Sequence, residues 1–210
     1  MTDKPRLPVA VLTDYICPFC YIGYLRLEKL RAHYDLAVNW ALVEIHPDNP
    51  AEGKPVKDLG YPKAHLDGLL GALDEMAREE GVSLSAHTFT TNSHRALLLA
   101  EASKQQGTGI FYRLHRRLFE SFLVEGRNIG DPQVLRALAA ECGVPEKTVE
   151  QAWIDPDYER RLKQNLAAAV QTGATGTPTF FIGEQRLTGA VPVASLLAAA
   201  RAASNRAAGS

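Results

Sequence analysis

The chain is poor in cysteine and has almost no net charge. It has 210 residues but three cysteines, and 23 Lys and Arg nearly balance 24 Asp and Glu, for a formal net charge of −1. A balance this even argues against broad electrostatic binding to nucleic acid or to an anionic membrane. An unpaired third structural thiol, Cys142, would be unusual in a secreted protein.

Long apolar runs are also missing. No stretch of 18 or more apolar residues occurs, so the sequence predicts no segment that spans a bilayer. Residues 1–8 lack the apolar core of a signal peptide, so we expect a cytosolic protein. Thiols are kept reduced there, and disulfides tend to be transient and catalytic. Hydrophobic residues make up 46% of the chain, which is enough for a substantial globular core.

The most informative motif is Cys-Pro-Phe-Cys at residues 17–20. It lies between an apolar, strand-like run at 7–12 and a helix-like run at 21–34. Two cysteines three residues apart in a first helical turn lie on the same side, close enough to bridge. Cys17 would be the N-cap, where unpaired N–H groups and the helix dipole favour an anion such as a thiolate. Pro18 suits the first helical position, where its missing N–H costs nothing.

Two other interpretations of the motif fit the sequence less well. A structural zinc site needs two more ligands, but the remaining cysteine is Cys142 and no histidine pair has H-x3–5-H spacing. A chance pair of buried cysteines would not explain the preceding strand, the proline and the following helix. The motif therefore favours thiol–disulfide exchange, with Cys17 as the nucleophile and Cys20 as the resolving thiol.

A Thr-Pro pair precedes another short strand. Thr177 and Pro178 come directly before the apolar run at 179–182. Proline cannot donate a hydrogen bond to a sheet, so Pro178 belongs at the start of the strand. Both a cis and a trans peptide bond fit such a turn, and the sequence alone does not decide between them.

The order of the predicted elements is strand, helix, strand, then about a hundred helical residues, then strand, strand, helix. The strand at 36–45 is predicted to be central, and the proline-rich segment 46–62 to be an irregular connection. The remaining predicted elements are helices at 64–80, 94–106, 110–122, 133–142, 145–153 and 158–171, strands at 179–182 and 186–188, and a helix at 193–203.

Four sequence segments carry a resemblance to a known family. They are residues 14–23, 44–47, 92–96 and 174–180, which follow in the same order over almost the whole chain. Together they resemble the thioredoxin superfamily, specifically its DsbA-like branch and most closely the cytosolic FrnE-like oxidoreductases.

The resemblance implies an α/β fold in which an all-helical domain interrupts a thioredoxin-like domain. The thioredoxin-like domain would comprise residues 1–62 and 172–210, and the helical insert residues 63–171. The resemblance also implies a cis bond before Pro178, in a loop that faces the dithiol. Two positions differ from the family pattern: Phe19 replaces the Trp or His of many relatives, and Thr177 replaces Val. Phe19 cannot stabilise a thiolate by charge, whereas Thr177 places a hydroxyl beside the sulfurs.

Several further residues are candidates for the site. Thr177 would offer its backbone to an extended peptide or thiol, next to Pro178. Phe19 would form part of an apolar rim. Asn92 would either line the substrate groove or cap the helix that begins at residue 94.

Two acids at strand ends are candidates for the proton relay. Asp14 and Glu44 could each relay the proton of Cys20, or could be ordinary strand-end acids. His94 is expected on a helix surface or in side-chain packing, and Cys142 in the buried core.

The first functional hypothesis is a cytosolic enzyme that exchanges dithiols and disulfides through Cys17 and Cys20, without a metal or a bound cofactor. Its substrate would be a disulfide-containing peptide or small molecule, with glutathione as a candidate co-substrate. A second hypothesis is a glutathione-dependent transferase or isomerase of the kappa-class or 2-hydroxychromene-2-carboxylate isomerase type, which would not need Cys20. A third is a redox-gated chaperone, whose client binding would survive Cys17→Ser.

Overall fold

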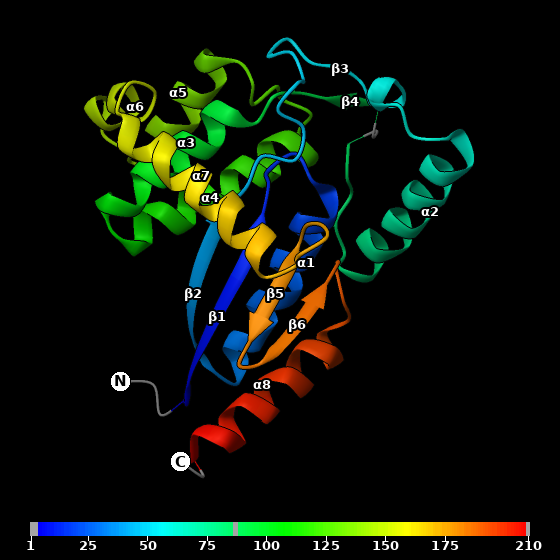
Figure 1. Ribbon diagram of the computed structural model, residues 1–210. Coiled ribbons are helices and arrows are strands. Elements are labelled where there is room, and N and C mark those ends of the chain that lie inside the picture. The colour runs from blue at the N-terminus through cyan, green and yellow to red at the C-terminus, as the bar shows by residue number, and fades with distance from the viewer. Residues whose placement is uncertain (1–3, 86–87, 209–210) are drawn as a thin grey trace.

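The computed structural model describes residues 4–85 and 88–208 and has a four-stranded mixed sheet at its centre (Figure 1). The strand order is β2-β1-β5-β6. β1 (Arg6–Thr13) pairs in parallel with β2 (Asp35–Leu42) and antiparallel with β5 (Thr179–Ile182), which pairs in turn with β6 (Gln185–Thr188). With the helices around this sheet, the predicted α/β fold with a thioredoxin-like core is confirmed.

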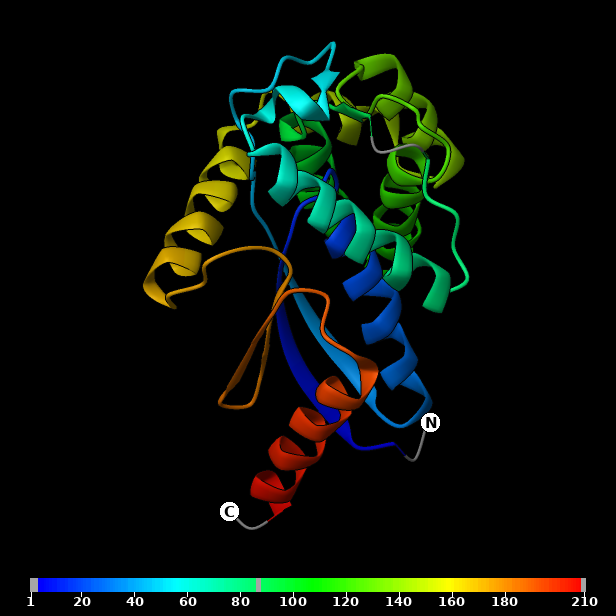
Figure 2. The same cartoon turned by 90° about the vertical axis from the view of Figure 1, so that its right-hand side faces the viewer.

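Two helices complete the thioredoxin-like part. α1 (Pro18–Glu28) and a 3₁₀ turn (Lys29–Ala32) carry the chain from β1 to β2, the crossover that a parallel strand pair requires. The last helix, α8 (Val193–Ala208), packs against α1, β1 and β5. Figure 2 shows α1 and α7 on opposite sides of the strands, and α7 packs on β2.

The segment between β2 and β5 is mainly helical. Its helices are α2 (Lys63–Glu79), α3 (His94–Ser103) with a 3₁₀ turn (Lys104–Gln106), α4 (Thr108–Leu123), α5 (Pro132–Glu141), α6 (Glu146–Ala152) and α7 (Pro156–Gln171). α3 packs against α4, α6 and α7, whereas α2 stands apart and packs on α1 (Figure 1). The domain boundaries given above stay a prediction, and residues 1–3, 86–87 and 209–210 of those ranges lie outside the described residues.

The prediction of an irregular connection over residues 46–62 is wrong in part. This segment contains β3 (Lys54–Pro55), which pairs antiparallel with β4 (Phe89–Thr90), and a 3₁₀ helix (Val56–Leu59). The two strands lie on either side of α2 in the sequence. Because their pairing is non-local, no turn signal in the sequence announces it.

The prediction that the second strand is central is also wrong, because β2 is an edge strand among the described residues and β1 and β5 are the inner ones. Helix α7 packs along β2, and burial beneath this helix explains why the sequence of β2 is apolar. Side chains of the insert occupy its outer carbonyls: Lys104 Nζ donates to the oxygen of Trp40 at 2.7 Å, and Asn165 Nδ2 to that of Leu42 at 3.0 Å.

One apolar core connects the sheet with the helices. Tyr15, which follows β1, packs edge-on against Phe119 of α4, with ring centroids 4.9 Å apart. Tyr24 of α1 likewise packs against Trp40 of β2. None of the described helices combines the length and the apolar composition needed to cross a lipid bilayer.

Helix α1 approaches the loop before β5 closely at Gly23. A Cβ atom at Gly23 would lie 2.9 Å from both Phe180 Cζ and Pro178 Cγ. Both neighbours are buried, so neither can move aside freely. Glycine at this position lets the helix that carries the dithiol pack directly on Pro178.

We therefore expect Gly23→Ala to destabilise the fold by about 1–3 kcal/mol, the usual cost of overpacking a core. Gly68→Ala is the matched control, because Gly68 lies within α2 and a Cβ atom there would have no heavy-atom neighbour within 4 Å. It should stabilise the protein by about 0.5–1 kcal/mol through helix propensity. Urea unfolding of both variants measures the difference, and equal effects would refute the close-packing argument.

Candidate active site at the Cys17–Cys20 dithiol

Cys17 is the N-cap residue of α1 and has extended backbone angles, φ −87° and ψ 111°. Pro18 occupies the first helical position, as predicted. The carbonyl of Cys17 accepts hydrogen bonds from the N–H groups of Cys20 and Tyr21. The Cys17 sulfur therefore lies at the positive end of the helix dipole, where a thiolate is favoured.

The protein environment shifts the pKa values of the two thiols in opposite directions. A hydrogen bond from the Cys20 thiol lowers the pKa of Cys17 below its usual value, against the opposing effect of burial. Burial raises the pKa of Cys20 well above its usual value, and its hydrogen bond to Cys17 raises it further. Cys17 is 7% exposed and Cys20 1% exposed. The environment thus favours the thiolate at Cys17 and the protonated thiol at the more deeply buried Cys20.

The loop before β5 lies against this dithiol. The peptide bond between Thr177 and Pro178 is cis. The Cys17 sulfur lies 3.6 Å from the carbonyl oxygen of Thr177, within hydrogen-bond reach for a thiol. The Thr177 side chain also lowers the pKa of Cys17 by hydrogen bonding. The structure therefore brings the carbonyl of Thr177 to the Cys17 sulfur, in the loop that the resemblance implied would face the dithiol.

Asp14 is a fully buried carboxyl group beside the dithiol. It accepts hydrogen bonds from the N–H of Ile16 at 3.3 Å, the N–H of Ile45 at 2.9 Å and the hydroxyl of Ser93 at 3.0 Å. Burial raises its pKa from 3.8 to about 7, although these three hydrogen bonds lower it. A negative charge on Asp14 in turn raises the pKa of Cys17.

Glu44, the other candidate acid, is engaged elsewhere. Its carboxylate bonds to His94 Nδ1 at 2.9 Å and accepts from Asn92 Nδ2 at 3.0 Å. His94 also lies 3.0 Å from Glu159 of α7, and its hydrogen bond to Glu44 raises its pKa. Of the two acids, Asp14 is the one that acts on Cys17 electrostatically.

Asn92 does not line the pocket that Cys17 lines. Its side-chain oxygen accepts a hydrogen bond at 2.9 Å from the N–H of His94, the first residue of α3. Asn92 therefore pairs a free N–H group at the start of the helix, although Ser93 is the N-cap residue. Asn92 lines a separate polar hollow with Arg95 and Gly130, among others. The structure thus supports the capping role of Asn92 and does not bring it to the dithiol.

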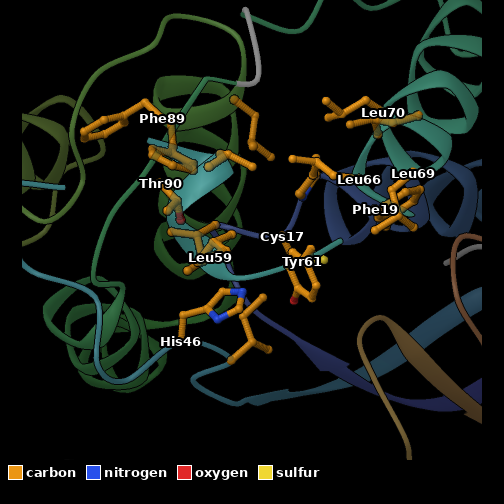
Figure 3. Close-up of a pocket in the computed structure, with 17 residues that line it drawn as sticks. Cys17, Phe19, His46, Leu59, Tyr61, Leu66, Leu69, Leu70, Phe89 and Thr90 are labelled. Atoms are coloured by element: carbon orange, nitrogen blue, oxygen red, sulfur yellow. The ribbon is translucent and has the colours of Figure 1, made fainter. Parts of the chain in front are cut away.

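A mainly apolar pocket of about 180 Å³ opens beside Cys17, and Phe19 lines it (Figure 3). One wall comes from α2 and consists of Leu66, Leu69, Leu70 and Leu73. This wall was not predicted from the sequence. The spacing of its leucines at i, i+3, i+4 and i+7 was the available signal, since it marks an apolar helix face.

Ser93 is a further residue beside the dithiol that was not predicted from the sequence. The Ser93 side chain makes no capping bond and donates to Asp14 instead. Within the described residues, no three His, Cys, Asp or Glu side chains are grouped as metal ligands.

Comparison with known proteins places this site in a family. The model of the DSBA-like thioredoxin domain matches residues 9–200. A probable DsbA oxidoreductase, SCO1869 from Streptomyces coelicolor, superposes with a TM-score of 0.83 at 22% identity, covering 95% of this chain and 90% of the other.

Two further solved structures have the same fold. A 2-hydroxychromene-2-carboxylate isomerase has a TM-score of 0.76 at 21% identity, covering 97% of this chain and 100% of the other. The cytosolic disulfide reductase DsbM from Pseudomonas aeruginosa, in a structure with GSH, has a TM-score of 0.66 at 18% identity, covering 86% and 88%.

The order of the two thiol pKa values leads to a prediction about reactivity. At about pH 7, Cys17 should be alkylated by iodoacetamide at least about tenfold faster than Cys20, because one pKa unit changes the thiolate fraction tenfold. Peptide mapping of the reduced protein over time measures both rates. Cys142, a buried thiol with a raised pKa, serves as the internal control. Equal rates for Cys17 and Cys20 would contradict the assignment.

Asp14 should make stability depend on pH. Because its folded pKa is raised, its contribution is fully present below the unfolded pKa of 3.8 and is lost as pH rises through about 7. Over this window the free energy of unfolding of the wild type should fall by up to about 4 kcal/mol relative to that of Asp14→Asn. Urea unfolding between about pH 5 and about pH 8 covers most of the window.

Ser93→Ala is the control for this effect. It removes a hydrogen bond that lowers the pKa of Asp14, so the pH window should extend upward while the carboxyl group stays in place. Stability curves for wild type and Asp14→Asn that run parallel across the pH range would show that Asp14 does not titrate there.

Proposed function

Because the chain belongs to the DSBA-like thioredoxin family, we propose that it is a thiol–disulfide oxidoreductase that uses Cys17 as its nucleophile and Cys20 as its resolving thiol. The observation that carries the proposal is the asymmetry of the dithiol. The Cys17 sulfur, at a helix N-terminus, has a lowered pKa. The Cys20 thiol, which is hydrogen-bonded to Cys17, has a raised pKa. Thiol–disulfide exchange needs this division between an attacking and a resolving thiol.

The reaction has two steps. The Cys17 thiolate attacks one sulfur of the substrate disulfide, a mixed disulfide forms, and the other half leaves as a thiolate that takes a proton from water. Cys20 then loses its proton and attacks the Cys17 sulfur, which releases the second half as a thiolate that takes a proton from water and leaves a Cys17–Cys20 disulfide. Asp14, a buried carboxyl with a pKa of about 7, is our candidate for the acceptor of the Cys20 proton.

Two molecules of a small thiol would restore the reduced enzyme. We propose glutathione for this part, and the fold shared with DsbM, which has been solved with GSH, supports it. The same likeness supports a cytosolic location, where glutathione and other reducing thiols are available. The FrnE-like assignment rests on residues 14–23 and the other matching segments of the sequence.

The proposal predicts different behaviour for the two cysteine variants. Cys20→Ser should accumulate a mixed disulfide on Cys17 when it is mixed with a disulfide substrate, because the first attack is intact and the second is absent. Cys17→Ser should form no such adduct, and both variants should lose the insulin-disulfide reduction expected of the wild type. Intact mass after quenching with acid measures the adduct directly.

Other outcomes would favour the other two hypotheses. A glutathione-dependent isomerase or transferase would keep its turnover in Cys20→Ser and accumulate no partner on Cys17. A redox-gated chaperone would keep binding its clients after Cys17→Ser. An inactive wild type together with either result would overturn the oxidoreductase proposal.

A further inference from the structure

The apolar pocket beside Cys17 has two walls from distant parts of the sequence. The leucines of α2 form one wall, and residues that include Leu59, Phe89 and Phe122 form the other. Figure 3 shows the α2 leucines on one side, Leu59 and Phe89 on the other, and Cys17 in the region between them. A substrate group that enters this pocket is therefore in contact with the residue that attacks the disulfide.

Apart from the Cys17 thiolate, the pocket lining carries no formal charge. None of the described residues that line the pocket is Asp, Glu, Lys or Arg. His46, at the edge shared with Tyr61, has its pKa lowered by burial and by Lys54, so it is neutral at physiological pH. The pocket therefore offers no counter-charge to a carboxylate, which would lose its hydration there without compensation.

The size of the pocket is that of a single ring. A cavity of roughly 150 Å³ lined by Leu, Ile and Phe binds benzene in another protein. The pocket here measures about 180 Å³, and most of its lining residues are Leu, Ile or Phe. Its volume matches one aromatic ring or a branched alkyl group.

The α2 wall is fixed in place. Leu73 is 1% exposed and packs with Ile22 of α1 in one apolar cluster. At the end of α2, the Arg26 guanidinium lies 3.0 Å from Glu80 and 2.6 Å from Glu79, and it also donates to the carbonyl of Ala190. Because α2 is anchored at its packed face and at its end, the pocket exists before any substrate arrives.

We propose that this pocket selects substrates in which a ring-sized apolar group lies close to one sulfur of the disulfide. The apolar half would bind in the pocket while its sulfur is attacked by Cys17, so this half would stay on Cys17 in the mixed disulfide and the other half would leave. The inference rests on the proposed oxidoreductase function and specifies its substrate class. The apolar group can belong to a small thiol or to a peptide side chain next to cysteine, and the experiment separates these sources.

The first arm of the experiment uses an unsymmetrical small disulfide of 2-phenylethanethiol and 2-hydroxyethanethiol, whose halves are both uncharged. Reduced Cys20→Ser is exposed to it, and early intact-mass spectra show which half remains on Cys17. Free N-acetylcysteine gives the chemical bias of the same disulfide. We expect the protein to retain the phenylethyl half about tenfold more often than the free thiol does, because the free energy gained by burying an aromatic ring corresponds to at least this ratio.

The second arm uses short peptides with Phe or Gly next to a cysteine, each disulfide-linked to 2-hydroxyethanethiol. A preference for the small phenylethyl half alone identifies small thiols as the source, and a preference for the Phe peptide identifies peptides. Preference in either arm supports the pocket.

Filling the pocket provides the matched test. Leu66→Trp, on the Cys20→Ser background, should reduce the preference to that of the free thiol, and Leu70→Trp is a second variant in case the first folds poorly. Leu166→Trp is the control, because Leu166 is 52% exposed on α7 and does not line the pocket, so it should keep the full preference. A mixed disulfide that forms without preference in both arms, or a preference that both filled-pocket variants retain, would overturn the inference. The absence of any mixed disulfide would instead refute the proposed function.

Discussion

A single buried carboxyl group holds three parts of the active site together. Asp14 accepts hydrogen bonds from the loop that leads to Cys17, from the backbone after β2 and from Ser93 at the start of α3. Each of these donors would be left unsatisfied in the interior if the carboxyl group were absent. The position of the dithiol relative to the helical insert therefore depends on a group whose charge also acts on the dithiol, and structure and reactivity are linked through Asp14.

A second polar interaction determines the apolar surroundings of the dithiol. Arg26 of α1 is 3% exposed and pairs with Glu79 and Glu80 at the end of α2. The pair with Glu80 is buried on both sides, and a buried ion pair is weak evidence for stability because desolvation offsets much of its attraction. Here it defines how α2 lies on α1, and α2 supplies the leucines beside Cys17. The apolar pocket is thus positioned by charged side chains that lie outside it.

The parts of the site that could be predicted from the sequence are those set by local chemistry. The capping position of Cys17, with Pro18 after it, follows from a few neighbouring residues, and the order of strands and helices follows from periodicity. Non-local relations could not be predicted. Asp14 and Glu44 both lie at strand ends, and only the arrangement in space buries one beside Cys17 and pairs the other with His94. β2 appeared central because strands covered by helices have the same apolar composition as inner strands.

The edge position of β2 has a consequence for engineering and for evolution of this fold. Its outer carbonyls at Trp40 and Leu42 are occupied by Lys104 and Asn165 of the insert. A shortened chain that joined β2 directly to β5 would expose a row of unpaired backbone groups, a template for strand addition by a second copy. The helical segment thus covers an edge that would otherwise be open to strand addition, and a minimal version would need a proline or an exposed lysine on β2 to block that edge.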